Sequence, residues 1–194
     1  MIYLMRHGQT VWNTERRMQG RLDSPLTATG IGQAQALGAL LAEQIEPTVH
    51  HRIVSSPLGR AWQTAVIVAD ALSLSPLDLV LEPRLVELGY GRWEGLTIDE
   101  IKERHPDSWE HRRADRWNVE TPGGESYAKV AARVGGWLSE TSEAGSLIVV
   151  CHGVTSRVMR GLYAGLSQEE TLALSEPQDR VFRLSDGHIE ELAV

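Results

Sequence analysis

Short apolar runs alternate along this chain with longer stretches in which alanine and leucine recur at helical spacing. The runs at 2–5 and 146–151 contain almost only apolar residues, which is typical of strands that are covered on both faces of a sheet. A third run lies at 52–55, and a run at 77–81 between two prolines predicts an edge strand. This alternation predicts an α/β layer fold.

Helix signals lie between these runs. Thr27 predicts the N-cap of a helix over 28–43 that is rich in alanine and leucine. Ser56 and Pro57 predict the N-cap and the first turn of a second helix. Further helices are expected from 125 through 138 and from 153 to about 163.

Two segments depart from this pattern. Residues 96–118 are polar and charged, and we expect one or two short helices over the sheet, within a rim or lid insertion at about 96–124. The runs at 181–184 and 188–192 flank an Asp-Gly pair, which predicts a hairpin. Since no repeat or linker is visible, the chain is expected to form a single domain.

Charge and composition narrow the possible partners. The 194 residues include 19 basic and 26 acidic side chains, which gives a net charge of −7. That balance argues against nucleic-acid binding and against binding to anionic membranes, but not against one small anion in a local positive pocket. Cys151 is the single cysteine, so no internal disulfide forms. Without a signal-like or membrane-length apolar segment, a cytoplasmic protein is expected.

Two of the predicted strands end in the same pair of residues, histidine followed by glycine. His7 and Gly8 follow the first run, and His152 and Gly153 follow the run at 146–151. If the two strands are neighbours, both histidines face one pocket, because ligands of open α/β sheets bind at the carboxyl ends of strands. Each glycine lets backbone amides approach a ligand closely, and a helix N-terminus after each pair favours an anion.

Two arginines add fixed positive charge near the same edge. Arg6 directly precedes His7, and Arg60 lies four residues after the predicted cap Ser56, in the first turn of its helix. The planar guanidinium group matches phosphate oxygens in pairs. The residues by themselves therefore predict a pocket for a phosphate group.

Short motifs follow one another in a fixed order over residues 4 to about 160. In this order they resemble the histidine phosphatase superfamily, within it the phosphoglycerate mutase-like branch, and there the broad-specificity phosphatases. The ordered set is far more specific than its first triplet alone. The motifs are Arg6-His7-Gly8 with Asn13, Gln19-Gly20, Asp23-Ser24-Pro25-Leu26-Thr27, Ser55-Ser56-Pro57-Leu58-Gly59-Arg60-Ala61, Leu85-Val86-Glu87-Leu88-Gly89, Pro122-Gly123-Gly124-Glu125-Ser126 and Val149-Val150-Cys151-His152-Gly153.

The resemblance implies a fold and a nucleophile. The fold is a three-layer α/β/α sandwich around a mostly parallel sheet, in one domain over residues 1–194. His7 is expected to attack phosphorus and form a phosphohistidine. Arg6, Arg60 and His152 are expected to clamp the phosphoryl oxygens.

The resemblance also implies a proton donor and further phosphate contacts. Glu87 is expected to protonate the leaving oxygen and then to activate water, with Glu82 and Glu94 as nearby alternatives. Neither metal nor cofactor is expected, because guanidinium and imidazole groups supply the positive charge. The expected substrate-binding residues are Asn13, Gln19, Gly20 and Gly153.

A phosphatase and a mutase would both use these residues. Only 64 residues separate Glu87 from His152, which is short for the mutases, and the segment 188–194 contains no lysine or arginine to close over a phosphoglycerate. Both features favour a phosphatase, whereas Tyr90 and the pair Arg112-Arg113 are mutase-like features that could hold a carboxylate. A non-catalytic phosphoester-binding protein is the third possibility, although no catalytic residue is missing. The substrate, a small phosphate ester, and the oligomeric state stay open.

Three other features have simpler explanations. His50 and His51 have no further metal-ligating residues around them, and a solvated loop is expected. Cys151 is expected to pack in the core of its strand. A pair of arginines such as Arg112-Arg113 usually lies on a solvated helix face, and this is the alternative to the carboxylate-binding role given above.

Overall fold

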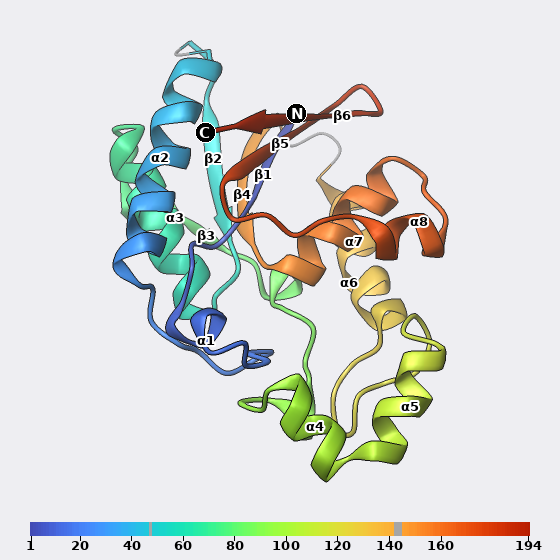
Figure 1. Cartoon of the computed structure of the whole chain (residues 1–194). Helices are drawn as coiled ribbons and strands as arrows, with labels where there is room; N and C mark the ends of the chain where they lie inside the picture. The colour runs from blue at the N-terminus through green and yellow to red at the C-terminus, as the bar shows by residue number, and fades with distance from the viewer. Residues whose placement is uncertain (47, 142–144) are drawn as a thin grey trace.

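The computed structural model describes residues 1–46, 48–141 and 145–194, and it contains one six-stranded sheet (Figure 1). The strand order is β3-β2-β4-β1-β5-β6. The pairs among β3, β2, β4 and β1 are parallel, and β5 and β6 add an antiparallel edge. The strands are β1 (Ile2–Arg6), β2 (His51–Ser55), β3 (Val80–Leu81), β4 (Ser146–Cys151), β5 (Arg180–Ser185) and β6 (His188–Ala193).

Helices cover both faces of the sheet, so the predicted three-layer α/β/α sandwich is confirmed. Helices α2 and α3 pack on one face, and α6 and α7 pack on the other (Figure 1). The α-helices are α1 (Val11–Thr14), α2 (Ala28–Gln44), α3 (Gly59–Ala71), α4 (Ile98–Arg104), α5 (Pro106–Ala114), α6 (Tyr127–Glu140), α7 (Gly153–Tyr163) and α8 (Gln168–Ala173). Short 3₁₀ helices span Pro76–Asp78, Pro83–Leu85 and Gly91–Trp93.

The apolar runs of the sequence are the central strands, as expected. In β1, Leu4 packs with the α6 and α7 side, whereas Tyr3 and Met5 pack with the α2 and α3 side. All six residues of β4 are buried. Cys151 lies in this core, and burial raises the pKa of its thiol. Continuous apolar runs arise because side chains pointing to either face of these strands are removed from water.

The predicted cap of α3 is wrong. The helix begins at Gly59, and its N-cap residue Leu58 offers no side-chain hydrogen bond. Instead, the Asp23 carboxylate accepts from the backbone amides of Gly59 at 2.5 Å and Arg60 at 3.3 Å. A carboxylate from a distant loop therefore satisfies the amides that Ser56 was expected to cap.

Three other expectations are partly wrong. The edge strand is reduced to β3, because Pro76 starts a 3₁₀ turn capped by Ser75. His51 does not lie in a loop: it begins β2, is buried, and its Nδ1 lies 2.8 Å from the Ser146 hydroxyl. Helices α4 and α5 lie beyond the carboxyl ends of the strands and not over the sheet (Figure 1).

The hairpin of β5 and β6 is confirmed, with Asp186 and Gly187 both at positive φ, 50° and 76°. This conformation matches a two-residue turn between twisted strands. The acidic residues of β6 pair with β5, Glu191 with Arg180 and Glu190 with Arg183. In the described residues, no helix is both long enough and apolar enough to cross a bilayer.

A tight backbone contact fixes the loop after β1. A Cβ atom at Gly8 would lie 2.2 Å from the Gly30 carbonyl oxygen, and a Cβ atom at Gly30 would lie 2.0 Å from the Gln9 carbonyl oxygen. Both contacts involve backbone, which cannot rotate away. The start of α2 therefore sets the path of the chain directly after His7.

This contact gives a test of how the loop is held. Gly30→Ala should lower the free energy of unfolding by about 1–3 kcal/mol, because the added methyl group forces the two backbones apart. Gly32→Ala, two residues along α2 with open space around it, should raise it by about 0.5–1 kcal/mol through helix propensity. Urea unfolding of both variants measures the difference; equal effects would show that the contact does not constrain the loop.

Candidate active site

Two buried histidines meet at the carboxyl ends of β1 and β4. The strands pair in parallel with Arg6 opposite Cys151, and the amide of His7 donates to the Cys151 carbonyl at 3.0 Å. His7 and His152 therefore follow the strands at equivalent places, with their ring centroids 5.2 Å apart. The expectation that neighbouring strands would bring the two histidines together is confirmed.

Hydrogen bonds fix which nitrogen of His7 is available for chemistry. Nδ1 lies 2.7 Å from the Gly8 carbonyl oxygen, which can only accept, so Nδ1 carries the proton. The lone pair of Nε2 then accepts from Arg60 Nε at 3.2 Å. Burial, followed by the charges of Arg6 and Arg60, holds the pKa of His7 well below its ordinary value. The ring is therefore a neutral imidazole, and Nε2 is its unprotonated nitrogen.

The guanidinium group of Arg60 is held on several sides. Nη1 donates to the Leu22 carbonyl at 2.7 Å and to the Asp23 carboxylate at 2.9 Å, and Nη2 donates to the Gly20 carbonyl at 2.8 Å. The remaining edge, with Nε, faces His7. Arg60 is thus a fixed positive charge beside the His7 ring, positioned by the loop that precedes α2.

His152 presents a buried nitrogen that has no partner. Its Nε2 lies 2.7 Å from Ser56 Oγ, which also accepts from the Leu58 amide at 3.3 Å. Ser56 Oγ can accept from Nε2 or donate its own proton to it, and in the second arrangement the ring proton lies on Nδ1. Burial, followed by the Arg60 charge, lowers the pKa of His152 as well. Its Nδ1 is buried without a hydrogen-bond partner.

Arg6 supplies a second buried nitrogen without a partner. Its Nη1 donates to the Glu176 carbonyl at 2.6 Å, while its Nε is buried and unpaired. Buried polar groups in proteins nearly always have a partner, and an unpaired donor costs stability. One buried donor and one buried imidazole nitrogen without partners, close to the Arg60 guanidinium, make a site that suits an anion.

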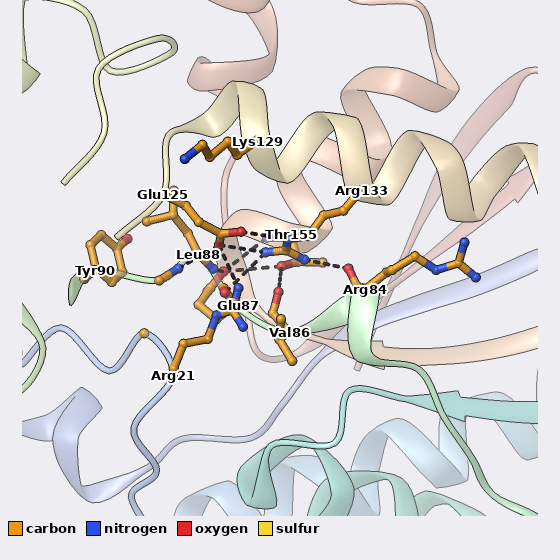
Figure 2. Close-up of polar contacts among 12 residues, drawn as sticks. Arg21, Arg84, Val86, Glu87, Leu88, Tyr90, Glu125, Lys129, Arg133 and Thr155 are labelled. Carbon is orange, nitrogen blue, oxygen red and sulfur yellow. Dashed lines mark hydrogen bonds and ion pairs between the residues drawn. The ribbon is translucent and has the colours of Figure 1, made fainter. Parts of the chain in front are cut away.

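Glu87 lies at the N-terminus of α7 (Figure 2). Its carboxylate accepts from the amides of Leu88 at 2.9 Å, Val154 at 3.2 Å and Thr155 at 3.3 Å. We expected the amides of this helix to face the anion directly. The second and third amides of α7, those of Val154 and Thr155, bind the Glu87 carboxylate instead, so that expectation is wrong for these two amides.

The environment of Glu87 favours its protonated form. Burial is the largest cause that raises the pKa of Glu87, the Glu176 charge adds to it, and the Leu88 amide and Arg60 act in the opposite direction. The two alternative acids have other partners. Glu82 pairs with Arg84 at 2.9 Å, and Glu94 accepts from the amides of Tyr90 and Arg21.

The segment that carries Glu87 is clamped against α6. Arg133 Nη1 donates to the Arg84 carbonyl at 2.5 Å, and its Nη2 donates to the Glu87 carbonyl at 3.3 Å (Figure 2). The Glu125 carboxylate pairs with Arg133 and accepts from the Gly89 amide at 2.9 Å. These contacts hold the main chain on both sides of Glu87.

The expected substrate-binding residues differ in what they offer. Asn13 Oδ1 accepts from the Thr10 amide at 3.0 Å. Gln19 is buried with its Oε1 unpaired, and the Gly20 carbonyl binds Arg60. At Gly153 a Cβ atom would lie 2.6 Å from a Glu176 carboxylate oxygen, so a larger residue would displace the Glu176 side chain.

Residues beyond the carboxyl ends of the strands line a cavity. Arg112 is buried and its Nη1 donates to the Val119 carbonyl at 2.5 Å, so the expected solvated helix face is wrong for it. Arg113 is exposed and pairs with Glu110. The cavity between α4, α5 and the Tyr90 turn has a volume of about 320 Å³. Its lining residues are Met18, Tyr90, Trp93, Ile98, Trp109, Arg112, Arg113 and Arg116.

Four residues around the site were not anticipated as part of it. Ser56 binds His152, Thr64 accepts from the Gly8 amide at 3.1 Å, Glu176 accepts from Arg6, and Gln178 donates to the His7 carbonyl at 3.1 Å. Ser56 and Thr64 lie in or beside a recognised motif, which is a usable signal. Glu176 and Gln178 lie beyond the last motif, and nothing in the sequence marked them.

Known proteins resemble the chain over most of its length. A phosphoserine phosphatase 1 of Hydrogenobacter thermophilus is 35% identical over 161 residues, which are 81% of this chain and 73% of that protein. A probable phosphoglycerate mutase GpmB of Yersinia pestis is 37% identical over 169 residues, 85% of this chain and 75% of that protein. The solved structure of a mycobacterial glucosyl-3-phosphoglycerate phosphatase with VO3 is 28% identical, with a TM-score of 0.79 over 99% of this chain and 96% of that one.

A family model covers nearly the whole described fold. The model of the histidine phosphatase superfamily (branch 1) matches residues 2–185, a range that runs from β1 to the end of β5. The two relatives above agree with this assignment over most of their own length. The chain belongs to the histidine phosphatase superfamily, branch 1.

Proposed function

We propose that the protein is a phosphomonoesterase that transfers the phosphoryl group of a small phosphate ester to His7 and then to water. The observation that carries this proposal is the pair of buried nitrogen atoms without a partner, Arg6 Nε and His152 Nδ1, together with His7, whose pKa burial and Arg6 lower. In the proposed complex the phosphoryl oxygens accept from Arg6 Nε and, with the ring proton on Nδ1, from His152, and phosphorus faces His7 Nε2. Relatives named as phosphatases support the same reaction class.

The first step forms a bond between His7 Nε2 and phosphorus and breaks the bond from phosphorus to the leaving oxygen. The neutral ring supplies the electron pair. Glu87, whose pKa is raised by burial and by Glu176, gives its proton to the leaving oxygen. Arg6, Arg60 and His152 stabilise the charge on the phosphoryl oxygens.

The second step returns the site to its starting state. The Glu87 carboxylate takes a proton from water while the water oxygen bonds to phosphorus and the bond from phosphorus to His7 breaks. Inorganic phosphate leaves, and both residues are as they were before the reaction. The two groups have oppositely shifted pKa values, and both shifts favour the uncharged forms that the first step uses.

The leaving group has a place under α4 and α5. The cavity of about 320 Å³ is lined in part by Tyr90, which lies three residues after Glu87 in the sequence. Its volume suits a small organic leaving group. We assign residues 96–124 as the rim that sets substrate choice. The substrate is a small phosphate ester, and cytoplasmic location remains our expectation.

A phosphoglycerate mutase is the second candidate. The relative named as a probable mutase and the position of Arg112 beside Tyr90 favour it. The short connection between Glu87 and His152 favours hydrolysis, since fewer residues are available to exclude water. In addition, β6 forms the sheet edge and its acidic side chains pair with β5.

Phosphorus NMR separates the two candidates in one tube. The protein is mixed in EDTA with 3-phosphoglycerate, a trace of 2,3-bisphosphoglycerate and a set of simple phosphate esters. We expect inorganic phosphate to appear from at least one ester without 2-phosphoglycerate. Formation of 2-phosphoglycerate that depends on the bisphosphate would contradict a phosphatase and establish the mutase.

Removal of the nucleophile should abolish turnover. His7→Ala is expected to lower kcat by roughly 10⁵-fold, as for other catalytic nucleophiles, with the thermal midpoint nearly unchanged. His188→Ala, at an exposed position of β6, serves as the matched control and should keep full activity. Substantial hydrolysis by purified His7→Ala would rule out the phosphohistidine route.

Removal of the proposed acid should depend on the leaving group. Glu87→Gln is expected to lower kcat/KM by about 10²–10⁴-fold for an alkyl phosphate. The loss for p-nitrophenyl phosphate should be far smaller, because p-nitrophenolate leaves without a proton. Glu82→Gln is the control and should affect both substrates alike. If Glu87→Gln showed equal losses on both substrates, Glu87 would not be the acid.

The state of His7 can be tested without a substrate. Because burial and two arginines lower the pKa of His7 well below 6.5, its ring should remain neutral at pH 6.5, with the proton on Nδ1. Nitrogen NMR of histidine-labelled protein, with His7→Ala to assign the signal, reads this directly. A protonated ring at that pH would contradict the account of the nucleophile.

A further inference from the structure

The segment between α8 and β5 is tied to both halves of the site. The Leu174 carbonyl accepts from Arg157 Nε at 2.8 Å, and the Ser175 carbonyl accepts from Arg160. The Glu176 carbonyl accepts from Arg6 Nη1 at 2.6 Å. A strap that lies about 170 residues after β1 is therefore held by α7 on one side and by the first arginine of the phosphate site on the other.

Gln178, at the end of this strap, reaches the main chain of the nucleophile. Its Nε2 donates to the His7 carbonyl at 3.1 Å and to Asn13 Oδ1 at 3.1 Å. The Gly8 amide, in the same peptide group, donates to Thr64, and the Gly8 carbonyl, in the next peptide group, accepts from His7 Nδ1. Gln178 thus completes a set of hydrogen bonds that leaves the His7 backbone little freedom.

The orientation of both amide groups follows from their partners. The Thr10 amide can only donate, so the atom of Asn13 that it meets must be the oxygen. Gln178 faces that oxygen and the His7 carbonyl, which both accept, so Gln178 must present its nitrogen. Two donors now occupy Asn13 Oδ1. The amide nitrogen is then the only polar atom of the Asn13 side chain that remains for a ligand, and this nitrogen is a hydrogen-bond donor.

We propose that Gln178 is a positioning residue of the phosphate site: it holds Asn13 with its amide nitrogen available to the phosphoryl oxygens and fixes the peptide of His7. This inference rests on the proposed function and adds to it a residue from outside every recognised motif. Removal of a group that orients another ligand-binding group typically lowers affinity or activity on the order of 10- to 100-fold.

Binding of vanadate and of inorganic phosphate tests this role without turnover. Gln178→Met keeps the length of the side chain and removes its donor, and we expect affinity for both anions to fall about tenfold. Gln168→Met, the same change at an exposed position of α8, is the matched control and should leave affinity unchanged. The thermal midpoint of each variant shows that it remains folded.

A double-mutant cycle separates positioning from a general structural effect. Asn13→Ala should weaken anion binding, and adding Gln178→Met should then cost less than about threefold, because the group that Gln178 orients is gone. Additive losses would overturn the proposal, and so would unchanged binding by Gln178→Met. If wild-type protein and Asn13→Ala both failed to bind either anion, the proposed function itself would fail.

Gln178→Glu provides a pH readout that a purely structural role does not give. An ionised carboxylate cannot donate to the His7 carbonyl or to Asn13, and its charge repels the anion, so binding near pH 7.5 should be weaker than for Gln178→Met. A protonated carboxyl group can donate again. Relative to the wild type, Gln178→Glu should therefore recover affinity as the pH falls toward 5. A constant ratio across this range would contradict the inference.

Discussion

The parallel pairing of β1 with β4 is the contact on which the rest of the site depends. With Arg6 opposite Cys151, each strand delivers its histidine to the same edge of the sheet. A shift of this register by one residue would turn His7 or His152 to the opposite face. The two core clusters oppose such a shift, because Leu4 and its neighbours in β1 pack alternately against α6–α7 and α2–α3.

The same burial that stabilises the sheet sets the charge state of the site. It lowers the pKa of His7 and raises the pKa of Glu87, so both groups are shifted toward their uncharged forms. The fixed positive charge comes from Arg6, held by a backbone carbonyl, and from Arg60, held by two backbone carbonyls and the Asp23 carboxylate. A chain with a net charge of −7 thereby builds a local anion site.

Much of the fold and part of the site could be predicted from the sequence, because those features are local. Apolar runs marked β1 and β4, and the pairs that follow them marked His7 and His152. The cap at Asp23 and the contact of Ser56 with His152 join segments that are far apart in the chain. Gln178 was not predicted from the sequence for the same reason, since 171 positions separate it from His7. No local pattern encodes such contacts, which depend on packing.

Detection of the phosphorylated enzyme is the most direct test of the central claim. The protein is mixed with a substrate, quenched in alkali, where phosphohistidine survives, and digested for tandem mass spectrometry. The account predicts a phosphoryl group on Nε2 of His7 that appears during turnover and disappears when the substrate is exhausted. A phosphoryl group on another residue, or steady hydrolysis with no phosphorylated His7 at any time, would contradict it.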